Sequence, residues 1–153
     1  MRIVFEVAGD RQIDREILRW GERAGDATPA FQAIGELLIG ETKVQFDTEG
    51  RHASGGWKPL KRATVASKQR RGLRLSVLQS TGSLMDSLTK RGDSNMILET
   101  SPTELTFGSR VPYGGFHQTG TRRMPARKPL ELTEATRRTS VKILQRWIVE
   151  GQT

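Results

Sequence analysis

The chain has 153 residues, a formal net charge of +8 and no cysteine. Its length is typical of one domain, expected here over residues 1–153, and the absence of cysteine excludes disulfides and thiolate metal sites. The longest apolar runs span only a few residues, so we expect no membrane-spanning helix and no signal peptide.

The first third of the chain predicts one strand and two helices. Residues 2–7 (RIVFEV) are rich in β-branched and aromatic types, which is typical of a strand. Apolar residues at helical spacing then predict a helix over about residues 10–25. Thr28, as a hydroxyl cap, and Pro29, at the first helical position, predict the start of a second helix, which an apolar stripe extends over residues 28–46.

The middle of the chain predicts a loop and two short helices. Residues 47–58 (DTEGRHASGGWK) are rich in turn formers, and we expect a mobile loop that Trp57 docks onto the core. Residues 64–71 predict a short basic helix, which Gly72 ends. Apolar residues at helical spacing predict another helix over residues 83–89.

The last third predicts a hairpin, an irregular segment and a helix. Residues 95–100 and 103–107 are strand-like and flank a Ser-Pro pair, which predicts a β-hairpin. Residues 113–130 (YGGFHQTGTRRMPARKPL) hold glycines and prolines that prevent a long helix or a central strand, so we expect an ordered loop with a short helical turn. Thr133 begins a C-terminal helix that Gly151 ends. Together the elements predict an α+β fold with a small, mostly antiparallel sheet packed against several helices, and with long basic loops.

Basic residues gather in two internal segments. Residues 50–85 include eight basic side chains and residues 107–130 include five, whereas all 17 acidic residues lie elsewhere. Such asymmetry suits a polyanion or an acidic protein surface, although a solvated loop is the simpler interpretation for any one residue. The side chains that we expect to face DNA or an acidic surface are Lys58, Lys61, Arg62, Lys68, Arg70, Arg71 and Arg74.

The motifs of common catalytic sites are absent from the sequence. It contains no phosphate-binding loop, dinucleotide fingerprint, nucleophile elbow or HExxH pair, and its two histidines lie far apart. We therefore expect neither an enzyme nor a cofactor or metal site. An alternative is a protein that binds nucleic acid without sequence preference, using the basic segments 51–74 and 110–128 with Trp57, Tyr113 and Phe116 as stacking groups.

Three motifs occur in one order along the chain. They are GWKPL at 56–60 followed by Thr64 and Lys68, LQSTGSL at 78–84 followed by Ser87, and Tyr113 with HQTG at 117–120 and MPAR at 124–127. Together they resemble the phage virion morphogenesis family, the tail-completion or neck proteins of Mu-like phages and prophages. The chain departs from the family at Gly114, where alanine is common, and after Arg127, where an aromatic-Leu-Gly ending is common.

The resemblance implies a structural subunit of the head–tail junction, not an enzyme. It implies a homo-oligomeric ring of six copies in the neck or tail of the virion, assembled in the host cytoplasm. The expected partners are the chain itself, other phage neck and tail proteins, and packaged DNA in the ring lumen. A hydrophobic content of only 35% fits a subunit whose core is completed by its neighbours.

The residues expected at a subunit interface or as loop anchors are Trp57, Tyr113, His117, Gln118, Arg123 and Arg127. We hypothesise that Tyr113, His117 and Gln118 fix the conformation of segment 113–130. Arg123 and Arg127 would bridge subunits, because a guanidinium pairs bidentately with a carboxylate. The alternative for His117 and Gln118 is that they satisfy buried backbone groups within one subunit.

Overall fold

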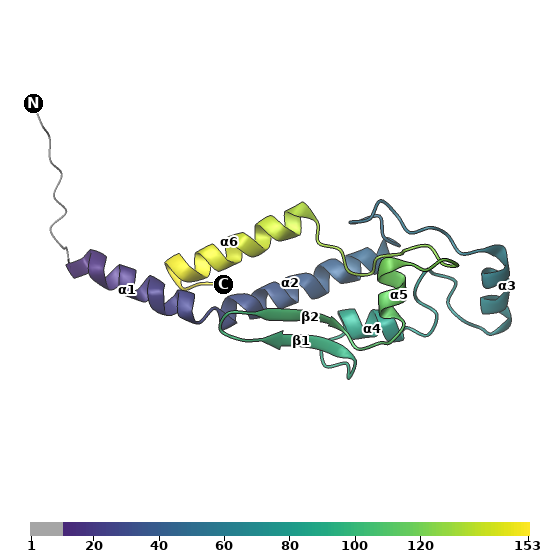
Figure 1. The fold of residues 1–153 in the computed structure, drawn as a ribbon, viewed down its shortest axis with the longest axis horizontal. Helices are drawn as coiled ribbons and strands as arrows, with labels where there is room; N and C mark the ends of the chain where they lie inside the picture. The colour runs from purple at the N-terminus through teal and green to yellow at the C-terminus, as the bar shows by residue number, and fades with distance from the viewer. Residues whose placement is uncertain (1–10) are drawn as a thin grey trace, which may run out of the picture.

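A computed structural model describes residues 11–153, so the strand predicted for residues 2–7 lies outside the described part of the chain. The elements are α1 (Arg11–Gly25), α2 (Thr28–Asp47), α3 (Arg62–Arg70), α4 (Ser83–Thr89), β1 (Met96–Thr100), β2 (Leu105–Ser109), α5 (Gly114–Thr119) and α6 (Glu134–Glu150). Figure 1 shows an elongated molecule built along α2, with α6 on one side and the β1–β2 hairpin on the other. This arrangement confirms the predicted α+β class.

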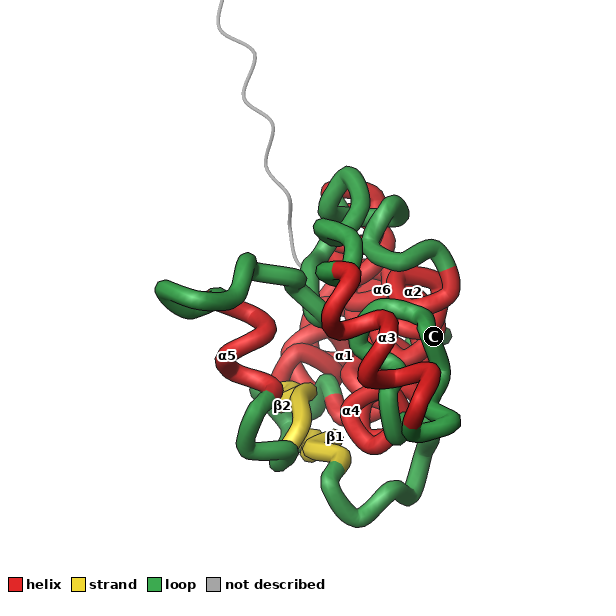
Figure 2. The backbone as a smooth tube through the Cα atoms, turned by 90° about the vertical axis from the view of Figure 1, so that its right-hand side faces the viewer, coloured by secondary structure: helices red, strands yellow, loops and turns green. Residues whose placement is uncertain are grey.

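The two ends of the molecule carry different elements. Helix α1 extends beyond the start of α2 at one end, whereas α3, α5 and the long loops lie at the other (Figure 1). Figure 2 shows the second end face-on, with α3 near the centre, α5 to its left and loop backbone around them. No helix in the described residues is long and apolar enough to cross a lipid bilayer.

The start of α2 differs from the prediction in its cap. The cap position belongs to Ala27, and the Thr28 amide donates to Oδ1 of Asp26 at 3.0 Å. Hydrogen bonding by the Thr28 side chain, and secondarily by the Thr28 amide, lowers the pKa of the Asp26 carboxyl. The prediction of a Thr28 hydroxyl cap is therefore wrong, because the preceding carboxylate satisfies the first amide, while Pro29 lies in the first turn as predicted.

Local signals set the other helix boundaries well. Helix α4 has the predicted bounds, and α3 begins two residues earlier than predicted, at Arg62. At the start of α6 the Thr133 hydroxyl accepts from the Thr136 amide at 3.0 Å, and Gly151 ends the helix in the left-handed conformation (φ +71). The predicted cap and stop of α6 are both confirmed.

The hairpin is the whole sheet of the described residues. Strands β1 and β2 are antiparallel, with Thr100 opposite Leu105 and Leu98 opposite Phe107. Two strands alone are marginal in water, so packing on α2 stabilises them. The contact is close at Gly35 of α2, where a Cβ atom would lie 2.8 Å from Cδ1 of Leu98.

The hydrophobic core lies at the C-terminal end of α2. It consists of Phe46, Trp57, Val77, Leu84, Leu88 and Val111, drawn from α2, α4 and three connecting segments. The rings of Phe46 and Trp57 meet edge to face with centroids 5.4 Å apart, a favourable aromatic geometry. Trp57 thus docks its loop on the end of α2.

The loop 47–58 is held by its own hydrogen bonds, in contrast to the predicted mobile loop. The Trp57 amide donates to the Glu49 carbonyl at 2.7 Å, and the Gly56 amide to the Gly50 carbonyl at 3.0 Å. The side chain of the buried Gln45 also accepts from the Ala53 amide at 2.9 Å. Gln45 was not predicted as a functional residue, and its place in an amphipathic helix gave no signal of this role.

Helix α1 is fastened at its C-terminal end only to α6. The Arg23 guanidinium donates to the carbonyls of Ile148 and Val149 at the end of α6, at 3.2 and 2.7 Å. In return the Trp147 indole donates to the carbonyls of Arg23 and Asp26. The preceding turns of α1 carry large apolar side chains that remain exposed.

We predict that Gly50→Ala destabilises the chain by at least about 2–3 kcal/mol, whereas Gly55→Ala costs about 1 kcal/mol. Both glycines have positive φ, but a Cβ at Gly50 would lie 2.4 Å from Cδ1 of Trp57, and one at Gly55 would meet nothing within 4 Å. Urea unfolding of the two variants measures the difference. Equal losses would show that the Trp57 contact does not constrain the loop.

Candidate functional site

The end of the molecule opposite α1 joins two loops that are far apart in sequence. The Trp57 indole donates to the Lys128 carbonyl at 3.1 Å, and the Gln45 amide donates to the same oxygen at 3.3 Å. The Ser54 hydroxyl donates to a carboxylate oxygen of Glu131. Loop 47–58 and segment 113–130 therefore hold each other, and the chain after Arg127 is fixed although it departs from the family pattern.

Segment 113–130 is also closed on itself. The Gln118 side chain donates to the Leu130 carbonyl at 2.6 Å and accepts from the Leu130 amide at 3.3 Å. The Arg127 amide donates to the His117 carbonyl at 2.8 Å. Gly120 (φ +76) is required at the closure, since a Cβ there would lie 2.7 Å from the Ala126 nitrogen. Gln118 thus satisfies backbone groups within the subunit.

Arg127 lies inside the subunit. Its side chain is 7% exposed, and the guanidinium donates to the carbonyls of Lys58 at 2.7 Å and Pro59 at 3.1 Å. Burial lowers the pKa of Arg127 from its usual value. The hypothesis that Arg127 bridges subunits does not match this position, because its donors already bind backbone of the same chain.

Lys68 is likewise turned inward, unlike the outward orientation expected from its basic surroundings. It is 8% exposed, and Nζ donates to the Ser76 carbonyl at 2.9 Å. Burial lowers its pKa, the Glu49 carboxylate opposes this shift, and the Arg127 charge adds to it. Lys68 and Arg127 therefore stabilise the fold from inside, because their charged groups donate hydrogen bonds to backbone carbonyls.

His117 is packed between Tyr113 and the basic interior. The rings of Tyr113 and His117 meet edge to face at 5.9 Å. Nδ1 of His117 is buried without a hydrogen-bond partner in the described structure. Burial, and secondarily the Arg127 charge, lowers the pKa of His117, so that the neutral ring is favoured.

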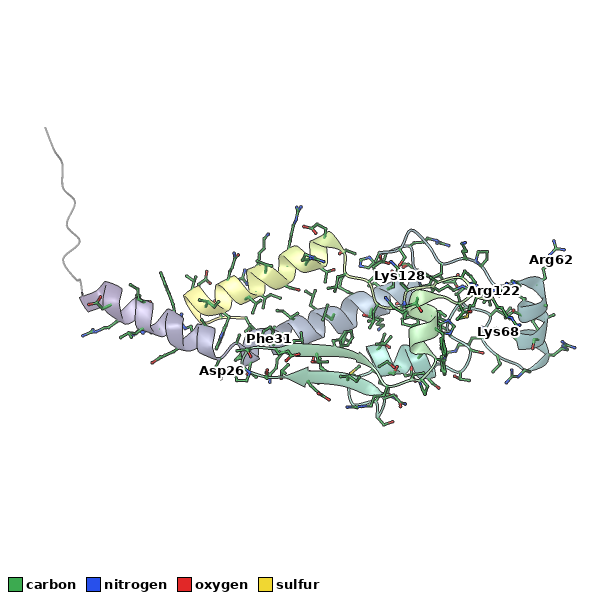
Figure 3. All side chains as sticks on the ribbon, in the orientation of Figure 1. Asp26, Phe31, Arg62, Lys68, Arg122 and Lys128 are labelled. Atoms are coloured by element: carbon green, nitrogen blue, oxygen red, sulfur yellow. The ribbon has the colours of Figure 1, made fainter. Side chains whose placement is uncertain are left out.

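The remaining cations of this end face solvent. In the part of the chain that the structure describes, most of them form no ion pair, and Figure 3 shows Arg62 on α3 and Arg122 on the loop that follows α5. Arg110 and Lys128 differ, because they pair with Glu99 and Glu131. The exposed, unpaired cations are Arg51, Lys58, Lys61, Arg62, Arg70, Arg71, Arg74, Arg122 and Arg123. We call this surface the basic end.

An open cavity of about 720 Å³ lies within the basic end. Its apolar lining comes from Leu60, Leu78, Leu84, Met124 and Pro125, and its hydroxyls from Thr64, Ser80, Thr81 and Ser83. The cations on its lining are Lys61, Lys68, Arg123 and Arg127. Sequence reasoning named these basic residues and the motifs around them, but it did not predict a cavity. Only the packing of three separate segments creates it.

The chemistry of this end suits binding more than bond making. It offers guanidinium, ammonium and hydroxyl donors around an apolar floor. No group of three or more His, Asp or Glu side chains among residues that the structure describes is placed to hold a metal ion. The site is therefore a polar-rimmed cavity that fits an apolar group flanked by anions.

These features define an α+β fold with an open cavity at a positively charged end. The model of the phage virion morphogenesis family matches residues 8–148, nearly the whole chain, and the chain belongs to this family. Neither a curated protein nor a solved structure matches it. Family membership gives the chain a role in the assembly of a phage particle and associates it with the virion.

We predict that Arg127→Lys destabilises the fold by about 2 kcal/mol. A single ammonium group cannot donate to the Lys58 and Pro59 carbonyls with the geometry of the two guanidinium nitrogens that now bind them. Arg123→Lys is the matched control in the same segment. Its side chain is exposed and forms no ion pair in the described structure, so it should change the free energy of unfolding by less than about 0.5 kcal/mol. Chemical denaturation measures both, and similar values for the two variants contradict the bracing role of Arg127.

We also predict a stability loss on mild acidification that depends on His117. The folded state holds the pKa of His117 below its ordinary value of 6.5, so the unfolded state takes up a proton first as the pH falls. The free energy of unfolding should decrease between pH 7.5 and 5.5, and His117→Gln should remove this part of the decrease. His52→Gln is the control and should retain it. An unchanged pH dependence in His117→Gln contradicts the burial of a neutral His117.

Proposed function

We propose that the chain is a structural subunit of the phage head–tail junction and catalyses no reaction. Copies would form a ring of six in the neck or tail, complete or terminate the tail, and join it to the head. Family membership supports the role in particle assembly. The observation that best supports self-association into a ring is the exposed apolar surface of α1.

Helix α1 presents apolar side chains that the subunit leaves uncovered. Ile17 is 55% exposed, Leu18 67% and Trp20 41%, and they stand on a helix that extends away from the core (Figure 1). Isolated exposed apolar residues are ordinary, but three on one projecting helix, of which Ile17 and Trp20 share a face, are typical of an interaction surface. A neighbouring subunit would bury them.

The basic end supports a location beside anions. Nine exposed cations without ion-pair partners in the described structure repel one another, and an anionic neighbour would relieve that repulsion. At a head–tail junction such neighbours are acidic surfaces of other neck and tail proteins, or DNA in the lumen of the ring. Assembly of this kind would take place in the host cytoplasm before the particle is released.

The same cations favour a second candidate, a protein that binds nucleic acid without sequence preference through segments 51–74 and 110–128. This candidate requires affinity for duplex DNA that falls steeply with salt while the chain stays monomeric. The ring proposal requires self-association. Sedimentation of the chain with and without DNA, over a series of salt concentrations, separates the two candidates.

We predict that phage-infected cells lacking this chain accumulate DNA-filled heads and separate tails. Purified chain added to such an extract should restore joined, infectious particles, and electron microscopy of the tails should show a ring at one end. Buffer added in place of the chain is the control, and it should leave heads and tails separate. Normal yields of joined particles without the chain would contradict the proposed function.

A further inference from the structure

We propose that α1 of one copy docks into the basic-end cavity of the next copy, a head-to-tail contact that deepens and rests on the ring proposed above. The contact would insert Leu18 and Ile17 into the apolar floor of the cavity. Asp14 and Glu22 of α1 would face Lys61 and Arg123 at its rim. In the described structure, the exposed face of α1 and the cavity complement one another in charge and in apolar character.

The exposed face of α1 combines an apolar centre with flanking acids. Leu18 is the most exposed of the large apolar residues at 67%. Asp14 and Glu22 stand one turn before and one turn after it, so the three side chains share one face of the helix. Both acids are exposed, and neither forms an ion pair in the part of the chain that the structure describes. Glu16 differs, because it pairs with Arg19 on another face of the helix.

The cavity has an apolar floor and cations at its rim, which match the apolar residue and the two acids of α1. Its floor is apolar, with Leu60, Leu78 and Met124 among its lining residues, and its volume of about 720 Å³ is ample for two aliphatic side chains. Lys61 and Arg123 line it, are exposed and have no ion-pair partner among the described residues. An apolar group between two carboxylates would therefore pack on the apolar floor and pair with the cations at the rim.

The geometry of the subunit requires that the helix come from another copy. Helix α2, with 20 residues and so about 30 Å long, separates α1 from the basic end. Figure 1 shows that α1 and α3 lie at opposite ends of the molecule. Because Arg23 and Trp147 fasten α1 to α6, it cannot fold back to reach its own cavity.

A contact between two different surfaces propagates from copy to copy. Such a heterologous contact closes into a ring if the rotation between copies divides a full turn, and otherwise gives a filament. The proposal therefore explains how one chain with one uncovered helix and one open cavity builds a ring without a second protein.

Charge reversal tests the contact directly. Asp14→Lys with Glu22→Lys forms one double variant, and Lys61→Glu with Arg123→Glu forms the other. Each alone should raise the concentration needed for assembly by at least about tenfold, whereas an equimolar mixture should assemble near the wild-type concentration, because each defective surface meets a reversed partner. The control, Lys142→Glu with Arg146→Glu, reverses two exposed charges on α6, outside both the cavity and the basic end, and should assemble as wild type.

Native mass spectrometry and sedimentation, performed with and without purified tails, measure assembly, and circular dichroism verifies that each variant is folded. Assembly of both double variants at wild-type concentration overturns the helix–cavity contact but leaves the ring proposal standing. A mixture that fails to recover overturns the contact in the same way. A wild-type chain that stays monomeric under both conditions overturns the contact and the ring together.

Crosslinking provides a second measurement that does not depend on charge. The sequence has no cysteine, so Leu18→Cys with Thr81→Cys introduces the only two thiols. Oxidation should give a ladder of covalent dimers, trimers and larger species up to a closed ring, since each copy contributes a different thiol to each neighbour. Leu18→Cys with Arg71→Cys, with the second thiol outside the cavity, should not. A ladder that is equal in both variants, or absent from both, contradicts the proposal.

Discussion

The Arg127 guanidinium bound to the carbonyls of Lys58 and Pro59 is the interaction on which the basic end depends. Three connecting segments meet there without a sheet to align them, and their backbone polar groups need partners inside the protein. The Arg127 side chain donates to the loop that precedes α3, and the Arg127 amide closes its own segment by donating to the His117 carbonyl. Since the side chain is almost fully buried, its charge is useful only if these acceptors remain in place.

This internal bracing explains how a strongly basic surface remains structured. Two cations, Lys68 and Arg127, bond to backbone carbonyls, while Trp57 covers the end of α2 and binds Lys128. The remaining cations repel one another on the outside. At the other end, α1 carries exposed apolar side chains. Both surfaces fit the role in particle assembly that family membership gives the chain.

Much of the fold is predictable from local signals in the sequence. Apolar spacing gives α2, α4 and α6, and Thr133 and Gly151 mark the ends of α6, because periodicity and caps act within a few residues. The site is less predictable. A cation in a basic segment is usually solvated, so the burial of Lys68 and Arg127 depends on carbonyls contributed by distant segments. The exposure of Leu18 also depends on the tertiary structure, since a helical stripe shows which residues share a face but not whether a neighbour covers it.

A cryo-EM map of the joined head–tail particle tests the central claim most directly. The account predicts a ring of this chain at the junction, with each basic end in contact with a neighbouring protein or with DNA, and each α1 buried against the next copy. A map in which segments 51–74 and 110–128 face only solvent, or in which the junction contains no copy of this chain, would contradict it.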